Sequence, residues 1–156
     1  MKKYLVFVLL AVVLNWGCAI ARIYPVQGPL AARKPAPVYN ATIRGAFFSG
    51  TLSTTLNDGE RFKVPMNPAS SGTNTAPILE SEWESVYGTG YYQFKVMPAQ
   101  YHLRGASTGS KGTELDVEVY KNEIRPVPAT KDDHSTIELF GVAKDSNGNV
   151  YKVILR

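Results

Sequence analysis

Two groups of residues have types and spacing that could support chemistry. Cys18 is the only cysteine among 156 residues, and it follows Gly17 directly after an apolar run. A thiol at that place can be acylated, which would tether the chain to a membrane. Glu80, Glu82 and Glu84 surround Trp83, a pattern that could supply the paired carboxylates of sugar hydrolysis. A solvated face beside one buried tryptophan explains the second group better.

Three further motifs are better explained as turns. The segment 105–113 (GASTGSKGT) departs from a phosphate loop at Ser110 and Gly112, and the segment beginning at Asp145 lacks the glycine and glutamate of a calcium loop. Asp132, Asp133, His134 and Ser135 are adjacent in sequence, which is not the geometry of a catalytic triad. We therefore expect no catalytic residue, no metal site and no cofactor.

The N-terminus has the organisation of an export signal. Lys2 and Lys3 precede eleven uncharged residues, 4–14, which are too few to cross a bilayer. Two cleavage sites compete. LNWGC (14–18) is similar to a bacterial lipobox and would make Cys18 the first mature residue, whereas Ala19-Ile20-Ala21 would allow ordinary cleavage after Ala21. The first predicts a lipid-anchored protein, and the second predicts a soluble periplasmic or secreted one.

Charge and cysteine count exclude other classes. Loss of Lys2 and Lys3 would leave 15 basic against 13 acidic residues, and no basic run marks a nucleic-acid-binding face. A lone cysteine cannot form an intramolecular disulfide, so the fold must depend on its hydrophobic core.

Residues 18–40 contain four prolines and no sustained periodicity. Because proline fixes φ and disfavours helix before it, we expect an extended tether over 18–40. The predicted organisation is a signal peptide over 1–17, a lipid-anchored tether over 18–40 and a β-domain over 41–156.

From residue 41 onward, apolar and polar residues alternate between turn signals, which predicts antiparallel strands. We expect strands at 41–48, 51–56, 60–65, 91–96, 101–105 and 114–119 and a final hairpin around Asn147-Gly148. The segment 78–88 favours a short helix, although a strand remains open. The fold class is therefore all-β with one short helix, as a small antiparallel barrel or sandwich of about eight strands.

Turn lengths predict particular pairs of facing residues. A two-residue loop at 49–50 would place Ile43 opposite Leu56, and a three-residue loop at 57–59 would place Leu52 opposite Val64. A loop at 110–112 would place Arg104 opposite Glu118. In the last hairpin we expect Val142 opposite Val153, while His102 should be an exposed sheet residue.

Aromatic residues near the middle of the chain could form a binding surface, because tyrosine and tryptophan are enriched at interfaces. The alternative is that they cover the core of a small β-domain. The candidate interaction residues are Trp83, Tyr87, Tyr91, Tyr92 and Tyr101.

Several stretches together resemble a group of short, uncharacterised proteobacterial lipoproteins. They are CAIARIYPVQGPLAA (18–32), GAFFSGTLSTTLNDGE (45–60), VYGTGYY (86–92), TGSKGTELDVEVY (108–120) and GVAKDSNGNVYKV (141–153). The resemblance implies acylation of Cys18 and a place on the periplasmic side of the outer membrane. Ala19, where an aspartate would signal otherwise, agrees with that sorting. The shared motifs are turns and strands, so the resemblance supplies no functional residues.

These observations favour an exported, membrane-anchored lipoprotein with a structural or interaction role in the cell envelope and an envelope protein as a possible partner. A periplasmic carrier that holds a small apolar ligand inside a barrel is the alternative from another class, because eight strands can just enclose one small molecule. An envelope hydrolase that uses carboxylates near Trp83 is a third and weaker hypothesis.

Overall fold

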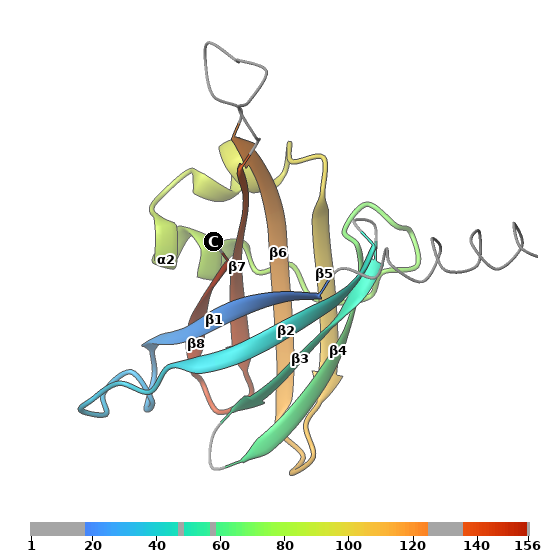
Figure 1. Cartoon of the computed structure of the whole chain (residues 1–156). Coiled ribbons are helices and arrows are strands. Elements are labelled where there is room, and N and C mark those ends of the chain that lie inside the picture. Colours follow the sequence, from blue (N-terminus) through green and yellow to red (C-terminus); the bar gives the residue numbers. More distant parts are fainter. Residues whose placement is uncertain (1–17, 47–48, 57–58, 125–135, 156) are drawn as a thin grey trace, which may run out of the picture.

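The chain folds into a closed antiparallel β-barrel of eight strands with a helical layer on one side (Figure 1). The structure is a computed structural model that describes residues 18–46, 49–56, 59–124 and 136–155. The predicted signal peptide, 1–17, and the Asp132–Ser135 motif lie outside the described residues. The all-β prediction is confirmed, and the choice between sandwich and barrel is resolved in favour of the barrel.

Each strand pairs with the next along the chain, and the first pairs with the last. The strands are β1 (Cys18–Gln27), β2 (Tyr39–Ala46), β3 (Ser49–Leu56), β4 (Glu60–Pro68), β5 (His102–Thr108), β6 (Glu114–Ile124), β7 (Thr136–Asp145) and β8 (Val150–Leu155). Between β4 and β5 the chain forms an α-helix, α2 (Glu80–Tyr87), and a π-helical turn, η1 (Tyr92–Val96). The helix predicted over 78–88 is therefore confirmed.

The barrel interior is filled by side chains that alternate along every strand. Its apolar core comprises Ala21, Ile23, Leu30, Ala41, Leu52, Leu56, Phe62, Val64, Met66, Leu115, Val117, Val119, Ala143, Tyr151 and Val153, each at most 3% exposed. Glycine makes room for this packing at Gly105, where an ideal β-carbon would lie 2.8 Å from Val64 Cγ1. The carrier hypothesis, which needs an enclosed cavity, stays a prediction.

The predicted tether over 18–40 is wrong. Residues 18–27 form β1, which pairs with β2 on one side and β8 on the other. Alternation at Ala21, Ile23 and Pro25 places small or apolar residues inside the barrel. Pro25 adjoins the irregularity in the β1–β8 register, a position where a strand tolerates proline. The other three prolines lie in the connection 28–38, so proline content alone was a poor guide.

Two predicted registers are confirmed. Leu52 lies opposite Val64, and Gly59 has the positive φ expected in that turn. Arg104 lies opposite Glu118, as the loop containing Gly112 predicted. Both hairpins have a glycine at the left-handed position, which fixes the turn and hence the pairing.

Two other predicted registers are wrong. Ile43 pairs with Leu52 instead of Leu56, because Ala46 pairs with Ser49 and residues 49–50 belong to β3. In the last hairpin Val153 faces Gly141 and not Val142. There the Asp145 carboxylate accepts hydrogen bonds from the backbone of Asn147 and Asn149, which lengthens the turn and shifts the pairing by one residue.

The strand predicted over 91–96 is also wrong, because these residues form η1. Tyr92 and Val96 are buried at a spacing of four, whereas Phe94 between them is 80% exposed. Apolar residues at 92, 94 and 96 fit a strand, but the first and last of them also fit one face of a helical turn.

Candidate functional site

The outer face of the barrel over β6 and β7 is covered by α2 and η1, and a carboxylate lies beneath this cover. Glu118 projects outward from β6 and its side chain is fully buried. One oxygen, Oε2, accepts hydrogen bonds from the backbone N–H of Leu79 at 2.9 Å and from the indole N–H of Trp83 at 3.0 Å. The carboxylate thereby fixes the start of α2 to the barrel wall, where the helix dipole also favours a negative charge.

The second oxygen of Glu118 connects the β5 strand to the helical layer. Oε1 lies 2.6 Å from Nε2 of His102, whose side chain is 12% exposed, and 3.5 Å from the hydroxyl of Tyr92. Burial, together with the nearby Glu118 charge, raises the pKa of Tyr92 to about 12. His102 was expected to be an exposed sheet residue. That prediction is wrong, because the helical layer covers this face.

The other glutamates of α2 also hold the helical layer in place. Glu84 accepts hydrogen bonds from the backbone N–H groups of Gly90 and Tyr92, which links α2 to η1. Glu82 accepts a hydrogen bond from the ammonium of Lys144 on β7 at 2.7 Å. Burial opposes the ionised form of Glu82, but the hydrogen bonds from Lys144 and Ser81 outweigh it and lower the pKa of this carboxyl.

These partners leave the three carboxylates of the hydrolase hypothesis pointing to different places. Glu80 accepts a hydrogen bond from the side-chain amide of Gln93, while Glu82 and Glu84 are bonded to Lys144 and to the backbone before η1. Glycoside hydrolysis requires two carboxyl groups that converge on one substrate. The geometry of α2 therefore gives that hypothesis no support.

Aromatic rings fill the space between the helical layer and the sheet. Trp83 stacks near Tyr91 with ring centroids 5.9 Å apart, and Tyr87 stacks on Tyr91 at 4.7 Å. Below them, Tyr120 and Phe140 stack at 5.8 Å, and the hydroxyls of Tyr91 and Tyr120 lie 2.7 Å apart. Burial and the neighbouring Tyr91 raise the pKa of Tyr120, which disfavours its ionised form.

The structure brings together three of the five predicted interaction residues. Trp83, Tyr87 and Tyr91 lie in the aromatic cluster, and Trp83 is fully buried. Tyr92 lies beside Glu118 and is also buried. Tyr101 is separate, since it precedes β5 and its ring lies 4.8 Å below the ammonium of Lys121. The first four of these residues form the underside of the helical layer, so a surface for a partner must be sought on its outer side.

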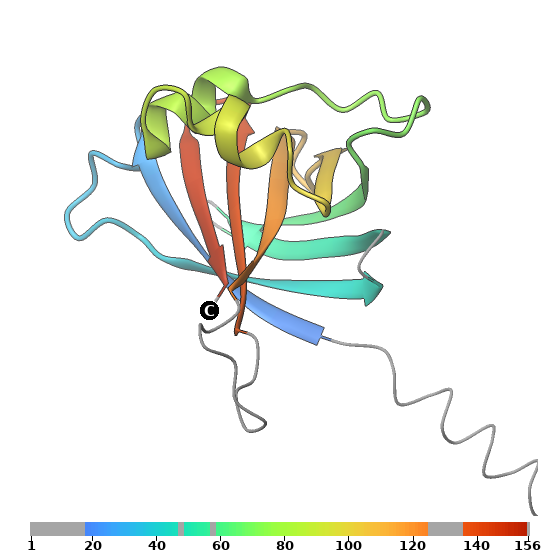
Figure 2. The same ribbon diagram turned by 90° about the horizontal axis from the view of Figure 1, so that it is seen from above.

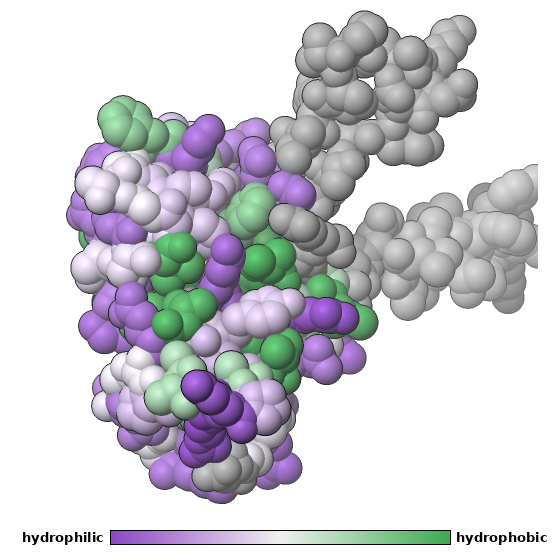
Figure 3. Space-filling model, turned by 90° about the vertical axis from the view of Figure 1, so that its left-hand side faces the viewer, coloured by the Kyte–Doolittle hydropathy of each residue, from purple (hydrophilic) through white to green (hydrophobic). Residues whose placement is uncertain are grey.

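The outer side of the helical layer exposes large apolar side chains. Phe94 is 80% exposed, Ile78 59% and Met97 56%. Figure 3 shows the left-hand side of the molecule in Figure 1, where hydrophobic side chains lie at mid-height with hydrophilic ones above and below them (Figure 3). Exposed apolar groups on a rigid support are a common feature of protein-binding surfaces.

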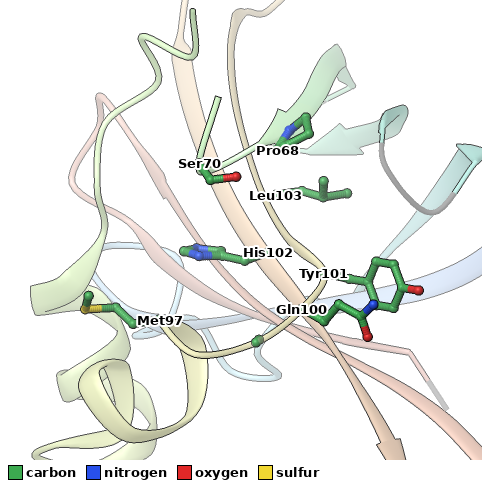
Figure 4. A pocket seen from close by; sticks show the side chains of 8 residues that line it. Pro68, Ser70, Met97, Gln100, Tyr101, His102 and Leu103 are labelled. Atoms are coloured by element: carbon green, nitrogen blue, oxygen red, sulfur yellow. The ribbon is translucent and has the colours of Figure 1, made fainter. Parts of the chain in front are cut away.

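A small pocket lies where the chain passes from η1 into β5 (Figure 4). Its lining includes Met97, Gln100, His102 and Leu103, and its volume is about 100 Å³. His102 points toward the helical layer, whereas Leu103 points into the barrel, as alternation requires. Pockets for drug-sized ligands have volumes of about 300–1,000 Å³. This pocket is smaller than that range and can hold water or a small ion.

A second buried polar cluster closes the opposite end of the barrel. Asp145 accepts a hydrogen bond from the hydroxyl of Tyr151 at 2.5 Å, and Asn149 receives the backbone N–H of Leu30. Nearby, Glu60 accepts the backbone N–H groups of Lys111 and Thr113. Burial opposes ionisation of Glu60, but these hydrogen bonds lower its pKa. Asp145 is bonded to its own turn and to Tyr151, and Glu60 is bonded to the turn between β5 and β6, so these carboxylates serve the fold.

Sequence reasoning missed Glu118 as a central residue. Along β6 it alternates with Val117 and Val119 in the same way as Glu114 and Asp116, a pattern typical of a solvated strand face. Arg104 was its expected partner. The two do face each other, but the guanidinium of Arg104 donates to the carbonyls of Ala76 and Ala69. Only the helix packed over it distinguishes Glu118 from Glu114 and Asp116, and no local sequence pattern predicts that this helix covers β6.

The fold and site together define a small closed β-barrel with an external helical layer. Scans of the chain against protein-family models, curated proteins and solved structures matched none of them. Within the described residues, no helix has the length and apolar character needed to cross a membrane. No group of three or more potential metal-ligating His, Cys, Asp or Glu side chains is found there either. The function must therefore be inferred from the geometry.

Proposed function

We propose that the protein is an exported lipoprotein anchored through acylated Cys18, and that its barrel is an interaction module of the cell envelope, on the periplasmic side of the outer membrane. The observation that carries the anchor is the start of β1. Residues 18–23 pair with β2 one after another, and Ala21 is fully buried. Cleavage after Ala21 would remove the first four residues of this strand, whereas cleavage before Cys18 would leave β1 whole.

The helical layer supports the interaction role. Its underside is fixed to the barrel by Glu118, Glu84 and the aromatic cluster, so its outer side is a rigid platform. Phe94 and Met97 project from this platform into solvent. A rigid support that presents apolar side chains lowers the entropy cost of binding a partner. An envelope protein with a complementary apolar surface is the partner that this chemistry fits.

Metabolic labelling with an alkyne fatty acid tests the anchor. We expect the wild-type protein to carry the label and the Cys18→Ser variant to lack it. Mass spectrometry of the mature N-terminus provides a second readout. An unlabelled wild-type chain that begins at Arg22 would show that the protein is released instead of anchored.

A photo-reactive amino acid tests the platform. Placed at Phe94, it should cross-link to a specific envelope protein in intact cells. The matched position is Asn147, which is exposed in the turn at the opposite end of the barrel. Equal cross-linking from both positions, or none from Phe94, would contradict an interaction role for this surface.

A further inference from the structure

The outer face of β1–β4 is the part of the barrel that the helical layer leaves bare. In Figure 2 the helices lie on one side of the barrel and β2 and β3 on the other, while β1 starts on that far side and runs toward the helices (Figure 2). Rows of facing residues run across this bare face, for example Ile20, Thr42, Ser53 and Lys63. All of these side chains point away from the core, because their neighbours Ala21, Leu52 and Val64 point into it.

The charges on this bare face have one sign. Arg22, Arg44, Arg61 and Lys63 are all exposed there. Among the described residues of β1–β4, Glu60 is the one carboxylate, and it is 3% exposed and hydrogen-bonded to the neighbouring turn. The face therefore attracts anions, and no acidic side chain of these four strands offsets that attraction.

Hydroxyl groups accompany the basic residues. A shallow groove of about 550 Å³ on this side is lined by Thr42, Ser53, Thr55, Arg61 and Lys63, among others. Guanidinium, ammonium and hydroxyl groups are the usual donors to phosphate oxygens. The face thus offers both charge and hydrogen bonds to a phosphate-bearing surface.

The position of Cys18 places this face close to the anchor. Cys18 is the first residue of β1 and pairs with Arg44. Neighbouring strands are about 5 Å apart, so Arg44 lies one strand from the anchor and Lys63 within roughly 15 Å. Ile20, two residues after Cys18, is 67% exposed and can enter the lipid interface.

We propose that the bare outer face of β1–β4 lies flat on the anionic phospholipid surface to which Cys18 is attached. This proposal rests on the anchor proposed above and adds the orientation of the barrel. Arg22, Arg44, Arg61 and Lys63 contact lipid phosphates, and Ile20 inserts beside the acyl chains. The helical layer with Phe94 then faces away from the membrane, where it is open to a partner.

Depth-dependent fluorescence quenching tests the orientation on the acylated chain. Because Cys18 is the only cysteine and its thiol is acylated, a cysteine introduced by Thr42→Cys or Lys95→Cys can be labelled specifically with bimane. The labelled proteins are reconstituted into phosphatidylcholine vesicles with or without phosphatidylglycerol, each containing a nitroxide-headgroup lipid. We expect strong quenching at position 42 and weak quenching at position 95. Quenching at position 42 should require phosphatidylglycerol and fall in about 1 M salt, where the screening length is about 3 Å.

Charge reversal identifies the residues responsible. A basic residue near an anionic membrane contributes about 1 kcal/mol, or roughly fivefold in the equilibrium between bound and detached orientations. Arg44→Glu combined with Lys63→Glu should therefore lower the equilibrium constant for the membrane-bound orientation by well over tenfold. The quenching at position 42 should fall accordingly. Lys95→Glu on the helical layer is the matched control and should leave quenching at position 42 unchanged.

The outcomes separate the two proposals. Equal quenching at positions 42 and 95, or quenching that ignores lipid charge, would overturn the orientation while leaving the anchor intact. If the mature chain instead begins at Arg22, the anchor fails. Vesicle co-sedimentation of that soluble form then tests membrane binding by the β1–β4 face alone. Binding to phosphatidylglycerol vesicles that is abolished by Arg44→Glu with Lys63→Glu would support the membrane-facing role of this face. Absence of such binding would overturn it.

Discussion

The two halves of the barrel differ in what their outer faces carry. Residues 69–156 hold eleven of the thirteen acidic residues, and among them Glu118, Glu82 and Glu84 are bonded to donors that fix α2 and η1 in place. Residues 18–68 hold six basic residues against two acidic ones, and β2 and β3 lie on the side away from the helices (Figure 2). In the covered half the carboxylates accept hydrogen bonds that hold the helical layer on the barrel, whereas in the bare half the basic side chains remain exposed to solvent.

This comparison shows that the same strand pattern can serve two purposes. Alternation supplies one inward apolar row and one outward polar row to every strand. On β6 the outward row becomes a second buried layer, because a connection of more than thirty residues folds back over it. On β2 and β3 the connections are short and the outward row stays exposed. The long connection before β5 therefore makes outward polar residues of β6 structural.

The largest expected effect on stability comes from removing the indole ring of Trp83 in the covered half. Trp83→Ala should lower the free energy of unfolding by about 3–5 kcal/mol, because it deletes a fully buried indole and leaves Glu118 with one donor fewer. Phe94→Ala, on the exposed side of the same layer, should change stability by less than about 0.5 kcal/mol. Denaturant unfolding compares the two. Similar losses would mean that the layer does not depend on its buried side.

Removing the charge of Glu118 should have the next largest effect on stability. Glu118→Gln keeps the shape of the side chain but weakens its hydrogen bonds to Leu79, Trp83 and His102. Hydrogen bonds to charged groups are worth about 1.5–3 kcal/mol, so we expect a loss of about 2 kcal/mol. Loosening should also shift the fluorescence of Trp83 to the red. Glu114→Gln, on the same strand but exposed, is the control. A loss of stability as small as that of the control would argue against a role of Glu118 in holding α2 on the barrel.

The junction between the halves can be probed at Gly105. An added β-carbon would clash with the carbonyl oxygen of Pro65 and lie 2.9 Å from Met66 Sδ, so β4 and β5 would have to separate. Gly105→Ala should cost about 1–3 kcal/mol, as overpacking does. Gly72→Ala, where the added carbon would meet nothing, should be close to neutral. Thermal unfolding measures both, and two neutral variants would indicate that the junction is loose.

The ion pair between Lys144 and Glu82 should have the smallest effect. Lys144 is 48% exposed, so a double-mutant cycle with Lys144→Met and Glu82→Gln should give about 0.5 kcal/mol at pH 7. The folded-state pKa of Glu82 lies below its ordinary value of 4.5. The contribution is therefore complete above about pH 4.5 and is lost as the pH falls through the lower, folded-state value. A coupling energy that stays constant down to pH 2 would contradict this assignment.

Strand content and class could be predicted from the sequence, because alternation and glycine turns are local signals. The turn at Gly59 and the pairing of Arg104 with Glu118 followed from loop length alone. The last hairpin did not, since the Asp145 side chain reshapes its turn. The sequence pattern does not distinguish two pairing registers one residue apart when apolar residues lie on both faces of the strands, as Val142 and Val153 do.

The arrangement of the site could not be predicted, because it depends on contacts between distant segments. His102 and Glu118 lie 16 residues apart, and the helix that buries them comes from between β4 and β5. The role of Cys18 as the first residue of a strand was hidden by four prolines. Proline at a register irregularity or in a connection is compatible with a barrel, and composition does not distinguish that from a tether.

The pairing of β1 with β8 has a consequence for how the protein reaches its native state. Arg22 faces Ile154, so the barrel closes only after nearly the whole chain is available. Contacts between such distant segments slow folding, and until closure the first and last strands present unpaired edges that can aggregate. With the export proposed above, N-terminus first, the chain would remain partly folded until its final strand arrives. Its first strand is the one held next to the proposed anchor, and this makes the membrane surface the place where folding ends.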